Sequence, residues 1–554
     1  MTRDDILVAA MALVGTAVVY LGLITYRHRS HISSLRKQGI PMPEGWSWLL
    51  GHSLVILKYT KRIPREANVL LAMKDLSAEF AETEMFLMDM WPGYPTSLIV
   101  FNPEALHLIS NKWNLPRPLQ SLEAIKPIVG GPNIVSMNGS DWKTWRSLLN
   151  PGFSPSSINS HVPFIVDSVG TFCDKLHENV GTLISLDEFA TRLTFDVIMK
   201  KLSRDSDVGY QRSEHLLPTA FDNITRWHSF WDVRVLLHPM RPFMQRRYGN
   251  IIKNYVRKEI EARFLELKSG STLERKKAQS VISLALDAYI SSKSDKQGVF
   301  PAALDESFVE TVINQVRLFL FAGNDTTSST IAFCFHSLAK YPACRAQMKT
   351  EHEALFGDKN TAQMLKDNPN LLNQCPYTNA FIKETLRLYP PAANMRRGQP
   401  GKNLTALNGQ IVQTEGFNII CVQQAVHANP RIWIRPQEFI PERWLVDPEH
   451  ELHPPANGYR PFDVGPRACI GLPLTMAEIK IVLLLAVRAF DIKPAYEEWD
   501  RLQAQSSWQN ITKWCGAEEI NTVYGDRAYQ SEKAGTHPSS GYPCVVSLAG
   551  ADHV

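Results

Sequence analysis

An apolar segment near the N-terminus places the strongest constraint on this chain. Residues 6–26, ILVAAMALVGTAVVYLGLITY, contain no charged side chain. Folded as a helix, they would span about 30 Å, which is the thickness of the hydrocarbon core of a bilayer. The segment is long for the core of a signal peptide, and no small-residue cleavage site follows it. It therefore predicts one transmembrane helix over residues 6–26, within an anchor segment of residues 1–30.

The charges on either side of this segment predict its orientation. Before it, Arg3 is offset by Asp4 and Asp5. Basic residues follow it at four positions: Arg27, Arg29, Arg36 and Lys37. Because flanking Lys and Arg residues stay on the cytosolic side, we expect the rest of the chain in the cytosol. The eight cysteines are scattered and lack the CxxC spacing of zinc or redox sites, which also favours a reducing compartment.

Composition bounds the remainder of the chain. Its 554 residues are 44% hydrophobic, which allows a large core, and length alone suggests about two to four domains. The net charge of +4 is not gathered into a dense basic tract, so nucleic-acid binding is not expected. Residues 31–52 contain prolines and glycines and predict a linker, so the soluble body would cover residues 53–554.

The pattern of the body predicts many helices and few strands. Apolar periodicity predicts helices over residues 159–178, 187–202, 240–267, 306–340, 377–388 and 474–490. Two hairpins are expected, one around the turn at residues 92–96 and one around Asn408 and Gly409, with a further strand after the second. The chain contains no P-loop and no GxGxxG between a strand and a helix, so no nucleotide or flavin module is expected.

The long helix predicted over residues 306–340 has a small, polar centre. Gly323, Asn324, Asp325, Thr326 and Thr327 interrupt an apolar run that must cross the protein interior. Glycine and asparagine are weak helix formers, and hydroxyl groups compete for backbone carbonyls. Two interpretations follow: a kinked core helix whose polar groups are satisfied internally, or a distorted turn that opens a pocket and passes protons to a small ligand.

Charged and aromatic residues at helical spacing form two further patterns. Glu384 and Arg387 lie three residues apart on one helix and can pair, and Arg443 in the irregular stretch 427–444 could bind back to Glu384. Taken alone, such a pair is most often a surface ion pair. Trp142 and Arg146 lie four residues apart, so an indole and a guanidinium share a helix face that could meet an anionic group.

A single cysteine lies where a turn runs into a helix. In PFDVGPRACIGLPLTMAEIK, residues 461–480, Cys469 precedes a helix that has Pro473 in its first turn. A thiolate there would be favoured by unpaired backbone N–H groups and by the helix dipole. Gly465 and Gly471 would let the backbone approach something flat and bulky. A lone cysteine is usually a buried structural residue, but these surroundings favour a functional one.

These residues resemble the signatures of the cytochrome P450 family of haem-thiolate monooxygenases. Phe462, Gly465, Arg467, Cys469 and Gly471 match the spacing F-x-x-G-x-R-x-C-x-G of its haem-ligand loop. Four other signatures occur in the order of the family: WxxxR at 142–146, AGxDTT at 322–327, ExxR at 384–387 and PERW at 441–444. The resemblance spans residue 39 to the C-terminus and implies a single large, mainly α haem domain with small β-sheets.

The resemblance implies a role for each matched residue. Cys469 would be the axial thiolate ligand of the iron of haem b, with Phe462 shielding it and Gly471 close by. Arg467, Arg146, Trp142 and Arg397 would bind the haem propionates. Glu384, Arg387 and Arg443 would form a structural triad that holds the segment before the haem loop. Asp325 and Thr326 would relay protons during dioxygen activation, and Ala322 and Gly323 would leave room for dioxygen and substrate.

The same resemblance implies partners and a location. Electrons would come from NADPH through the membrane-bound NADPH-cytochrome P450 reductase, with cytochrome b5 as a second donor, at the cytosolic face of the endoplasmic reticulum. The substrate would be a hydrophobic small molecule, because the family's substrate-contacting zones are mostly apolar here. The C-terminal stretch, including EEWDRLQAQSSWQNITKW, resembles that of fungal enzymes that tailor polyketides, terpenoids or alkaloids in secondary metabolism. Asn324 departs from the residue that many relatives carry.

Two other functions compete with a monooxygenase. A haem-thiolate isomerase or dehydratase would use no external electrons, but it would not need the Asp325–Thr326 pair. A non-catalytic haem-binding sensor would be expected to carry a damaged AGxDTT segment or an added signalling module. The sequence has neither of these, and it favours oxygen insertion.

Overall fold

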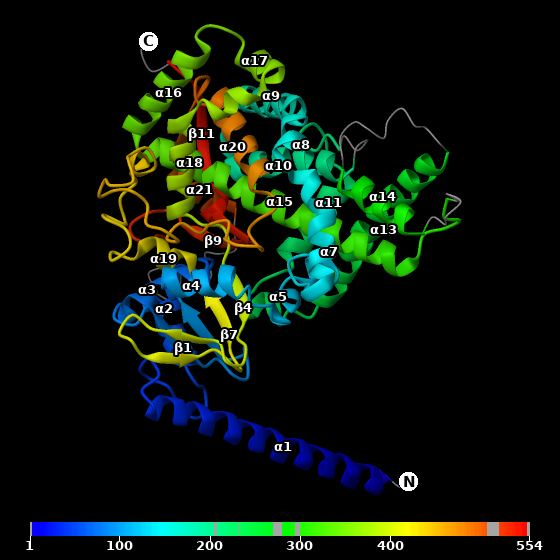
Figure 1. The fold of residues 1–554 in the computed structure, drawn as a ribbon, viewed down its shortest axis with the longest axis vertical. Coiled ribbons are helices and arrows are strands. Elements are labelled where there is room, and N and C mark those ends of the chain that lie inside the picture. Colours follow the sequence, from blue (N-terminus) through cyan, green and yellow to red (C-terminus); the bar gives the residue numbers. More distant parts are fainter. Residues whose placement is uncertain are drawn as a thin grey trace.

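The computed structural model describes residues 3–203, 208–230, 232–269, 280–293, 300–506, 520–533 and 535–550. A helix-rich body carries small sheets, and one long helix, α1, projects away from it on the side of the sheet that contains β1 (Figure 1). The predicted mainly α architecture is therefore confirmed. Part of the C-terminal stretch that resembles fungal enzymes, residues 507–519, lies outside the described residues.

Helix α1 (Arg3–Lys37) contains the predicted transmembrane segment. Among the described residues it is the one helix long and apolar enough to cross a membrane. It continues to Lys37, so the first residues of the predicted linker are helical. The reason is tertiary, because Arg29 and Ile32 on its last turns are fully buried against the body. The body therefore holds the end of α1 directly.

A buried ion pair makes this attachment. Arg29 pairs with Asp89 and donates a hydrogen bond of 2.6 Å to the carbonyl of Trp91. Asp89 also accepts from the indole of Trp46 at 2.9 Å, and His28 Nε2 lies 2.9 Å from its second oxygen. One of the four basic residues that predicted the orientation of the anchor thus has an internal partner, while Arg36 and Lys37 remain in the last turn.

The largest sheet joins segments far apart in the chain. Its strand order is β1 (Met85–Met88), β2 (Ser97–Val100), β7 (Asn418–Cys421) and β4 (Asn394–Arg397). The hairpin predicted around residues 92–96 is confirmed as β1 and β2. The hairpin around Asn408 and Gly409 is confirmed as β5 (Asn403–Thr405) and β6 (Ile411–Gln413). The parallel pairing of β2 with β7 brings the N-terminal region beside the region before the cysteine loop.

Two smaller sheets were not predicted from the sequence. One contains β3 (Leu183–Ser185), β11 (Pro543–Leu548) and β8 (Phe490–Pro494). The other is the hairpin of β9 (Gln530–Lys533) and β10 (Gly535–Pro538), which packs against the long central helix. Their strands are short and lack a strong alternating pattern, so tertiary pairing decides them.

The predicted helices are present with small shifts at their ends. The region predicted to end at residue 490 ends at Ala486, because strand β8 begins at Phe490. An apolar core lies among the helices and a second one lies at the large sheet. The helices after α1 are α2 (Ser53–Thr60), α3 (Val69–Ser77), α4 (Pro103–His107), α5 (Gln120–Glu123), α6 (Lys126–Val129), α7 (Gly139–Leu149), α8 (Pro155–Asn159), α9 (Val162–Glu178), α10 (Leu186–Leu202), α11 (Leu216–Arg226), α12 (Val233–Leu236), α13 (Arg241–Lys268), α14 (Val281–Lys293), α15 (Glu306–Lys340), α16 (Pro342–Phe356), α17 (Thr361–Asp367), α18 (Pro376–Leu388), α19 (Gln423–Ala428), α20 (Leu472–Ala486) and α21 (Tyr496–Ser506).

Helix α15 passes through the centre of the body as one unbroken helix (Figure 1). It packs against α10, α18, α20 and the β9–β10 hairpin. The distorted turn considered for its polar centre is not seen. Two of its hydroxyl groups bond within the helix: Thr326 donates to the carbonyl of Ala322 at 2.8 Å and Thr330 to that of Thr326 at 2.7 Å. Thr327 instead pairs with Thr475 on α20, and Ser329 bonds the β9–β10 hairpin.

Candidate active site

The loop before α20 presents the thiol of Cys469. Its backbone N–H donates to the carbonyl of Phe462 at 2.9 Å, which closes the loop. Gly465 has a φ of 80°, and a Cβ there would lie 2.7 Å from the carbonyl oxygen of Ser110. Only glycine fits this conformation and this close approach. Gly465 therefore has two causes, the left-handed turn that carries the cysteine and the close approach of the distant Ser110 backbone.

The thiol of Cys469 combines solvent exposure with dense surroundings. Its side chain is exposed, yet desolvation by the surrounding protein raises its pKa. The backbone N–H groups of Gly471 and Leu472 and the positive charge of Arg146 act in the opposite direction and favour the thiolate. A cysteine at a helix N-terminus beside an arginine is a good ligand for a soft metal ion. The described residues contain no cluster of three or more His, Cys, Asp or Glu that could hold a metal on its own.

Arginine side chains gather beside this loop. Asp463 accepts hydrogen bonds from Arg396 at 2.7 Å and from Arg460 at 2.9 Å. The guanidinium of Arg467 stacks on the ring of Trp142 at 4.4 Å and donates to the carbonyl of Met137 at 3.0 Å. The cluster consists of Arg117, Arg146, Arg396, Arg460 and Arg467.

This cluster has more positive charge than the described protein groups neutralise. Burial and the charges of Arg396 and Arg146 lower the pKa of Arg467 to about 10, and burial with neighbouring arginines lowers that of Arg117 well below its usual value. Several buried guanidinium nitrogens in the described chain have no hydrogen-bond partner: Arg117 Nε, Arg396 Nε, Arg460 Nε and Nη1, and Arg467 Nε. Haem carries two propionate carboxylates, so these residues beside an exposed thiol fit haem.

The structure separates the residues predicted to contact the propionates. Trp142, Arg146 and Arg467 come together on α7 and the cysteine loop. Arg397 lies on β4 next to Arg396, but its side chain is exposed, whereas that of Arg396 is buried in the cluster. Successive residues of a strand point to opposite faces, which explains the difference. A role for Arg397 at the haem edge therefore remains a prediction.

Several members of the site were missed from the sequence: Arg117, Asn394, Arg396, Arg460 and Asp463. Arg117 comes from the segment before α5, and its backbone N–H donates to Asn138 Oδ1, which also accepts from Arg467 at 3.0 Å. Neither Arg117 nor Asn394 belongs to a recognisable local motif. Asn394 accepts from both Arg117 and Arg396 and donates to Asp463. Only the sheet pairing and the loop before α5 bring these residues together.

The predicted acid and alcohol on α15 face different surroundings. Asp325 is buried, and its carboxylate accepts from His537 Nε2 at 2.9 Å. Thr326 is half-buried, and its hydroxyl donates to the carbonyl of Ala322, whose side chain is exposed. His537 was missed because it lies more than 200 positions further along the chain and belongs to a short strand.

Gly323 and Asn324 attach α15 to α10. A Cβ at Gly323 would lie 2.8 Å from Cδ1 of Ile198, so close helix packing explains the glycine in this structure. The prediction that it leaves room for dioxygen is not tested by this contact. Asn324, which departs from the common family pattern, donates to the carbonyl of Thr191 at 2.8 Å and to Thr194 Oγ1 at 3.0 Å. The side-chain amide of Asn324 therefore joins α15 to α10.

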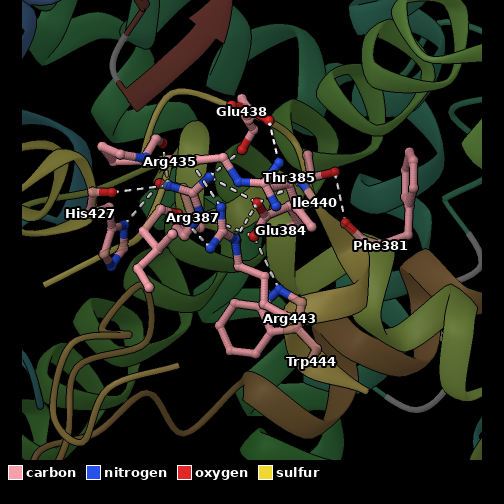
Figure 2. Close-up of polar contacts among 12 residues, drawn as sticks. Phe381, Glu384, Thr385, Arg387, His427, Arg435, Glu438, Ile440, Arg443 and Trp444 are labelled. Carbon is pink, nitrogen blue, oxygen red and sulfur yellow. Dashed lines mark hydrogen bonds and ion pairs between the residues drawn. The ribbon is translucent and has the colours of Figure 1, made fainter. Parts of the chain in front are cut away.

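Glu384, Arg387 and Arg443 form a buried network, as Figure 2 shows. Arg387 donates twice to Glu384, at 2.8 and 2.9 Å, and Arg443 donates to it at 3.0 Å. Glu384 also accepts from the backbone N–H of Ile440 and the indole of Trp444. The side chains of the three charged residues are at most 1% exposed, so the alternative of a surface pair is excluded.

This network holds the irregular segment that leads to the cysteine loop. Arg387 donates to the backbone carbonyls of His427, Pro436 and Glu438, and Arg443 to those of Ile434 and Arg435. Burial lowers the pKa of His427 to about 3, so the ring is neutral. It bonds the carbonyl of Arg387 through Nδ1 and accepts the N–H of Arg460 through Nε2. A continuous polar chain therefore joins the triad to the arginine cluster.

Comparisons with known proteins agree with this site. The chain matches the cytochrome P450 family model over residues 41–512. It is 34% identical to the cytochrome P450 monooxygenase polC of Polytolypa hystricis, over 94% of this chain and 92% of that protein. It is 29% identical to the cytochrome P450 monooxygenase acrF of Aspergillus aculeatus, over 88% of this chain and 98% of that protein.

The likeness extends to more distant relatives and to the fold. The chain is 26% identical to cytochrome P450 4A6 of Oryctolagus cuniculus, over 85% of this chain and 87% of that protein. The crystal structure of the cytochrome P450DA heme domain superposes with a TM-score of 0.68 at 18% identity, over 92% of this chain and 97% of that one, which shows the shared fold. The chain therefore belongs to the cytochrome P450 family and is a haem-thiolate monooxygenase.

Proposed function

We propose that the protein is a membrane-anchored monooxygenase that inserts one oxygen atom from dioxygen into a hydrophobic small molecule. Electrons come from NADPH through NADPH-cytochrome P450 reductase, with cytochrome b5 as a possible second donor, and the product belongs to fungal secondary metabolism. The observation that carries the proposal is the exposed thiol of Cys469 beside a cluster of incompletely paired buried arginines. The fungal monooxygenases among the relatives support the setting.

The anchor supports a location at the cytosolic face of the endoplasmic reticulum. Helix α1 is apolar enough to span a bilayer, and exposed leucines follow it at positions 49, 50 and 54. Such side chains next to an anchor are well placed to contact lipid. Arg36 and Lys37 end the helix, and the positive-inside rule assigns that end to the cytosol. A hydrophobic substrate dissolved in the membrane would then be close to the body.

Each residue of the site would have a separate role in binding haem or in handling protons. Haem, when bound, supplies dioxygen activation and oxygen insertion. Cys469 would hold its iron, and Arg117, Arg146 and Arg467 would neutralise its propionates. Asp325 and Thr326 would hold and pass on protons, and Ala322 would leave room for dioxygen and substrate. The Glu384 network would keep the cysteine loop in position and take no part in the chemistry.

A carbon monoxide difference spectrum tests this proposal. The dithionite-reduced protein in microsomes should absorb at about 450 nm, which is diagnostic of thiolate-ligated haem iron, and Cys469→Ala should lose that band. Cys173→Ala is the matched control, because this half-buried cysteine lies on α9 away from the loop and should keep the band. A haem-containing wild type without the band would refute the assignment of Cys469 and the monooxygenase mechanism with it.

A further inference from the structure

A histidine lies between two buried carboxylates on the far side of Asp325. His537 Nε2 is 2.9 Å from Asp325 Oδ1, and His537 Nδ1 is 2.7 Å from Asp187 Oδ1. His537 belongs to β10 and Asp187 to the first turn of α10, so three elements meet here. The side chain of His537 is 4% exposed and that of Asp187 is 1% exposed. No motif in the sequence indicates this cluster.

The geometry requires two donors on one imidazole. Both ring nitrogens face carboxylate oxygens, and a histidine donates from both only as the imidazolium. Burial alone would lower the pKa of His537, but the charges of Asp187 and Asp325 outweigh it and raise the pKa to about 10. His537 is therefore a protonated group held next to the acid of the predicted relay.

Further charged groups balance the cluster on its outer side. Lys533 Nζ lies 3.7 Å from Asp187 Oδ2. On α11, the charge of Asp222 raises the pKa of Lys533 and that of Arg226 lowers it. The charge of Asp325 partly offsets the lowering of the pKa of His228 by burial, and His228 follows α11. Asp222 and Arg226 pair with one another at 2.7 Å. The net charge of the Asp187 and Asp325 carboxylates, the His537 imidazolium and the Lys533 ammonium is therefore about zero.

The hairpin that carries His537 is held by one hydrogen bond to α15 and one to the segment after α18, and neither involves the carboxylate. Ser329 Oγ donates to the carbonyl of Thr536, and Thr536 Oγ1 donates to that of Pro391. Gly535 passes so close to Asp325 that any Cβ there would collide with the carboxylate. Ser329 therefore provides a control position, because its loss would loosen the same hairpin without touching the ion cluster.

A small crevice opens from this cluster toward the surface. Its volume of about 30 Å³ has room for about one water molecule. Its polar lining includes Asp325, His537, Lys533 and Asp222, and apolar and aromatic side chains such as Phe195 and Phe221 complete it. The side chain of Lys533 is 45% exposed, so the outer end of the cluster reaches solvent. A water molecule there would meet both a proton acceptor and proton donors.

We propose that His537 is a positioning residue that fixes the Asp325 carboxylate and supplies it with protons from this crevice, while Asp187 orients the imidazole. In the transfer, the His537 Nε2–H bond breaks and an O–H bond forms on Asp325, which leaves a neutral imidazole and a neutral carboxyl group. A proton from water in the crevice then restores the imidazolium. The inference rests on the proposed monooxygenase function, in which Asp325 and Thr326 pass protons onward.

The protonation state can be measured without turnover. In ferric protein labelled with ¹³C-histidine, the His537 signal is identified by its absence from His537→Gln and followed with pH. We expect it to stay imidazolium through neutral pH and to titrate near pH 10. Asp187→Asn should move that titration to lower pH by at least about one unit, since one partner charge is lost. A His537 that is neutral at pH 7 in the folded wild type would overturn the inference.

The proton supply is tested by the fate of reducing equivalents. With NADPH, reductase and dioxygen, we expect His537→Gln and Asp187→Asn to release severalfold more hydrogen peroxide per NADPH than wild type and to show an altered D₂O effect. Ser329→Ala should match wild type in both. Equal peroxide release from His537→Gln and Ser329→Ala would refute the role of His537 in proton supply. Because each variant is first checked for the band at about 450 nm, failure here is distinct from failure of the proposed function.

The cluster also has a signature in stability. The pKa of His537 is raised above that of an unfolded histidine, about 6.5, so its stabilisation is complete below that pH and is lost as pH rises through about 10. The thermal midpoint of wild type should therefore fall more steeply between these two pH values than that of His537→Gln. Parallel curves for the two proteins would contradict the ion cluster.

Discussion

At the scale of single residues, the candidate site depends on charges that the protein leaves incompletely matched. Arg117 and Arg467 are cations in a cluster where Asp463 pairs with two other arginines. Burial lowers the pKa values of both arginines most, and repulsion from neighbouring arginines adds to it; a bound anion would offset both effects. The Cys469 thiol, the arginines and the Trp142 ring then form one receptor for a flat dianion, although they come from separate segments.

Arg117→Met tests this electrostatic account. Loss of a charged hydrogen bond to a propionate should weaken haem retention by about tenfold or more, because such bonds contribute about 1.5–3 kcal/mol. Transfer of haem to excess apomyoglobin measures the loss rate. Lys112→Met is the control, because this exposed lysine lies on the same segment. Unchanged haem transfer in Arg117→Met would remove Arg117 from the haem site.

At the scale of elements, the contact between α10 and α15 positions the acid and the alcohol. Gly323 lets Ile198 approach α15, and the amide of Asn324 bonds the backbone and hydroxyl of α10. Asp187 at the start of α10 meets Asp325 through His537. The polar centre of α15 is therefore a junction of helix packing and charge: its polar groups are satisfied inside the protein, as the first interpretation from the sequence proposed, but the helix has neither the kink nor the distorted turn.

Gly323→Ala should destabilise the protein by about 1–3 kcal/mol, as overpacking in a close helix contact does. Ile198→Ala removes both side-chain atoms nearest to the new Cβ but leaves a cavity of its own, so the double variant should lose less stability than the sum of the two single variants. Gly170→Ala on α9 has open space around it and should be neutral or stabilising. Additive losses in the double variant would show that Ile198 is not the obstacle.

At the scale of the whole molecule, buried polar networks connect the anchor, the sheet and the helical body. The Arg29–Asp89 pair attaches α1 to the sheet region. The Glu384 network fixes residues 427–444, and His427 and Arg460 continue it to Asp463 beside the cysteine loop. Damage far from the haem site should therefore reach it through this chain of contacts.

Glu384→Gln tests that connection. It leaves two buried guanidinium groups without their carboxylate, and breaking a buried ion pair costs about 3–5 kcal/mol. We expect a lower thermal midpoint and a weaker band at about 450 nm, because part of the protein converts to an inactive form. Glu438→Gln removes an exposed pair with Arg435 and should cost less than about 1 kcal/mol. Wild-type haem content and stability in Glu384→Gln would exclude the structural role of the triad.

Local stretches of the sequence are enough to predict several features of this protein. The apolar run of α1, the periodicity of the long helices and the turns of two hairpins all follow from neighbouring residues. These features need only backbone preferences and hydropathy, which a local stretch carries. The pairing of Glu384 with Arg443 was also predicted, because both residues lie within recognisable motifs.

The contacts between residues far apart in the chain became visible in the folded protein alone. The arginine cluster draws on Arg117, β4 and the cysteine loop, and the partner of Asp325 is His537 on a short strand near the C-terminus. The tertiary structure also decided which neighbour is buried, as with Arg396 rather than Arg397, and that α15 stays unbroken. Charge pairing and burial depend on what packs across the fold, and no local pattern encodes that.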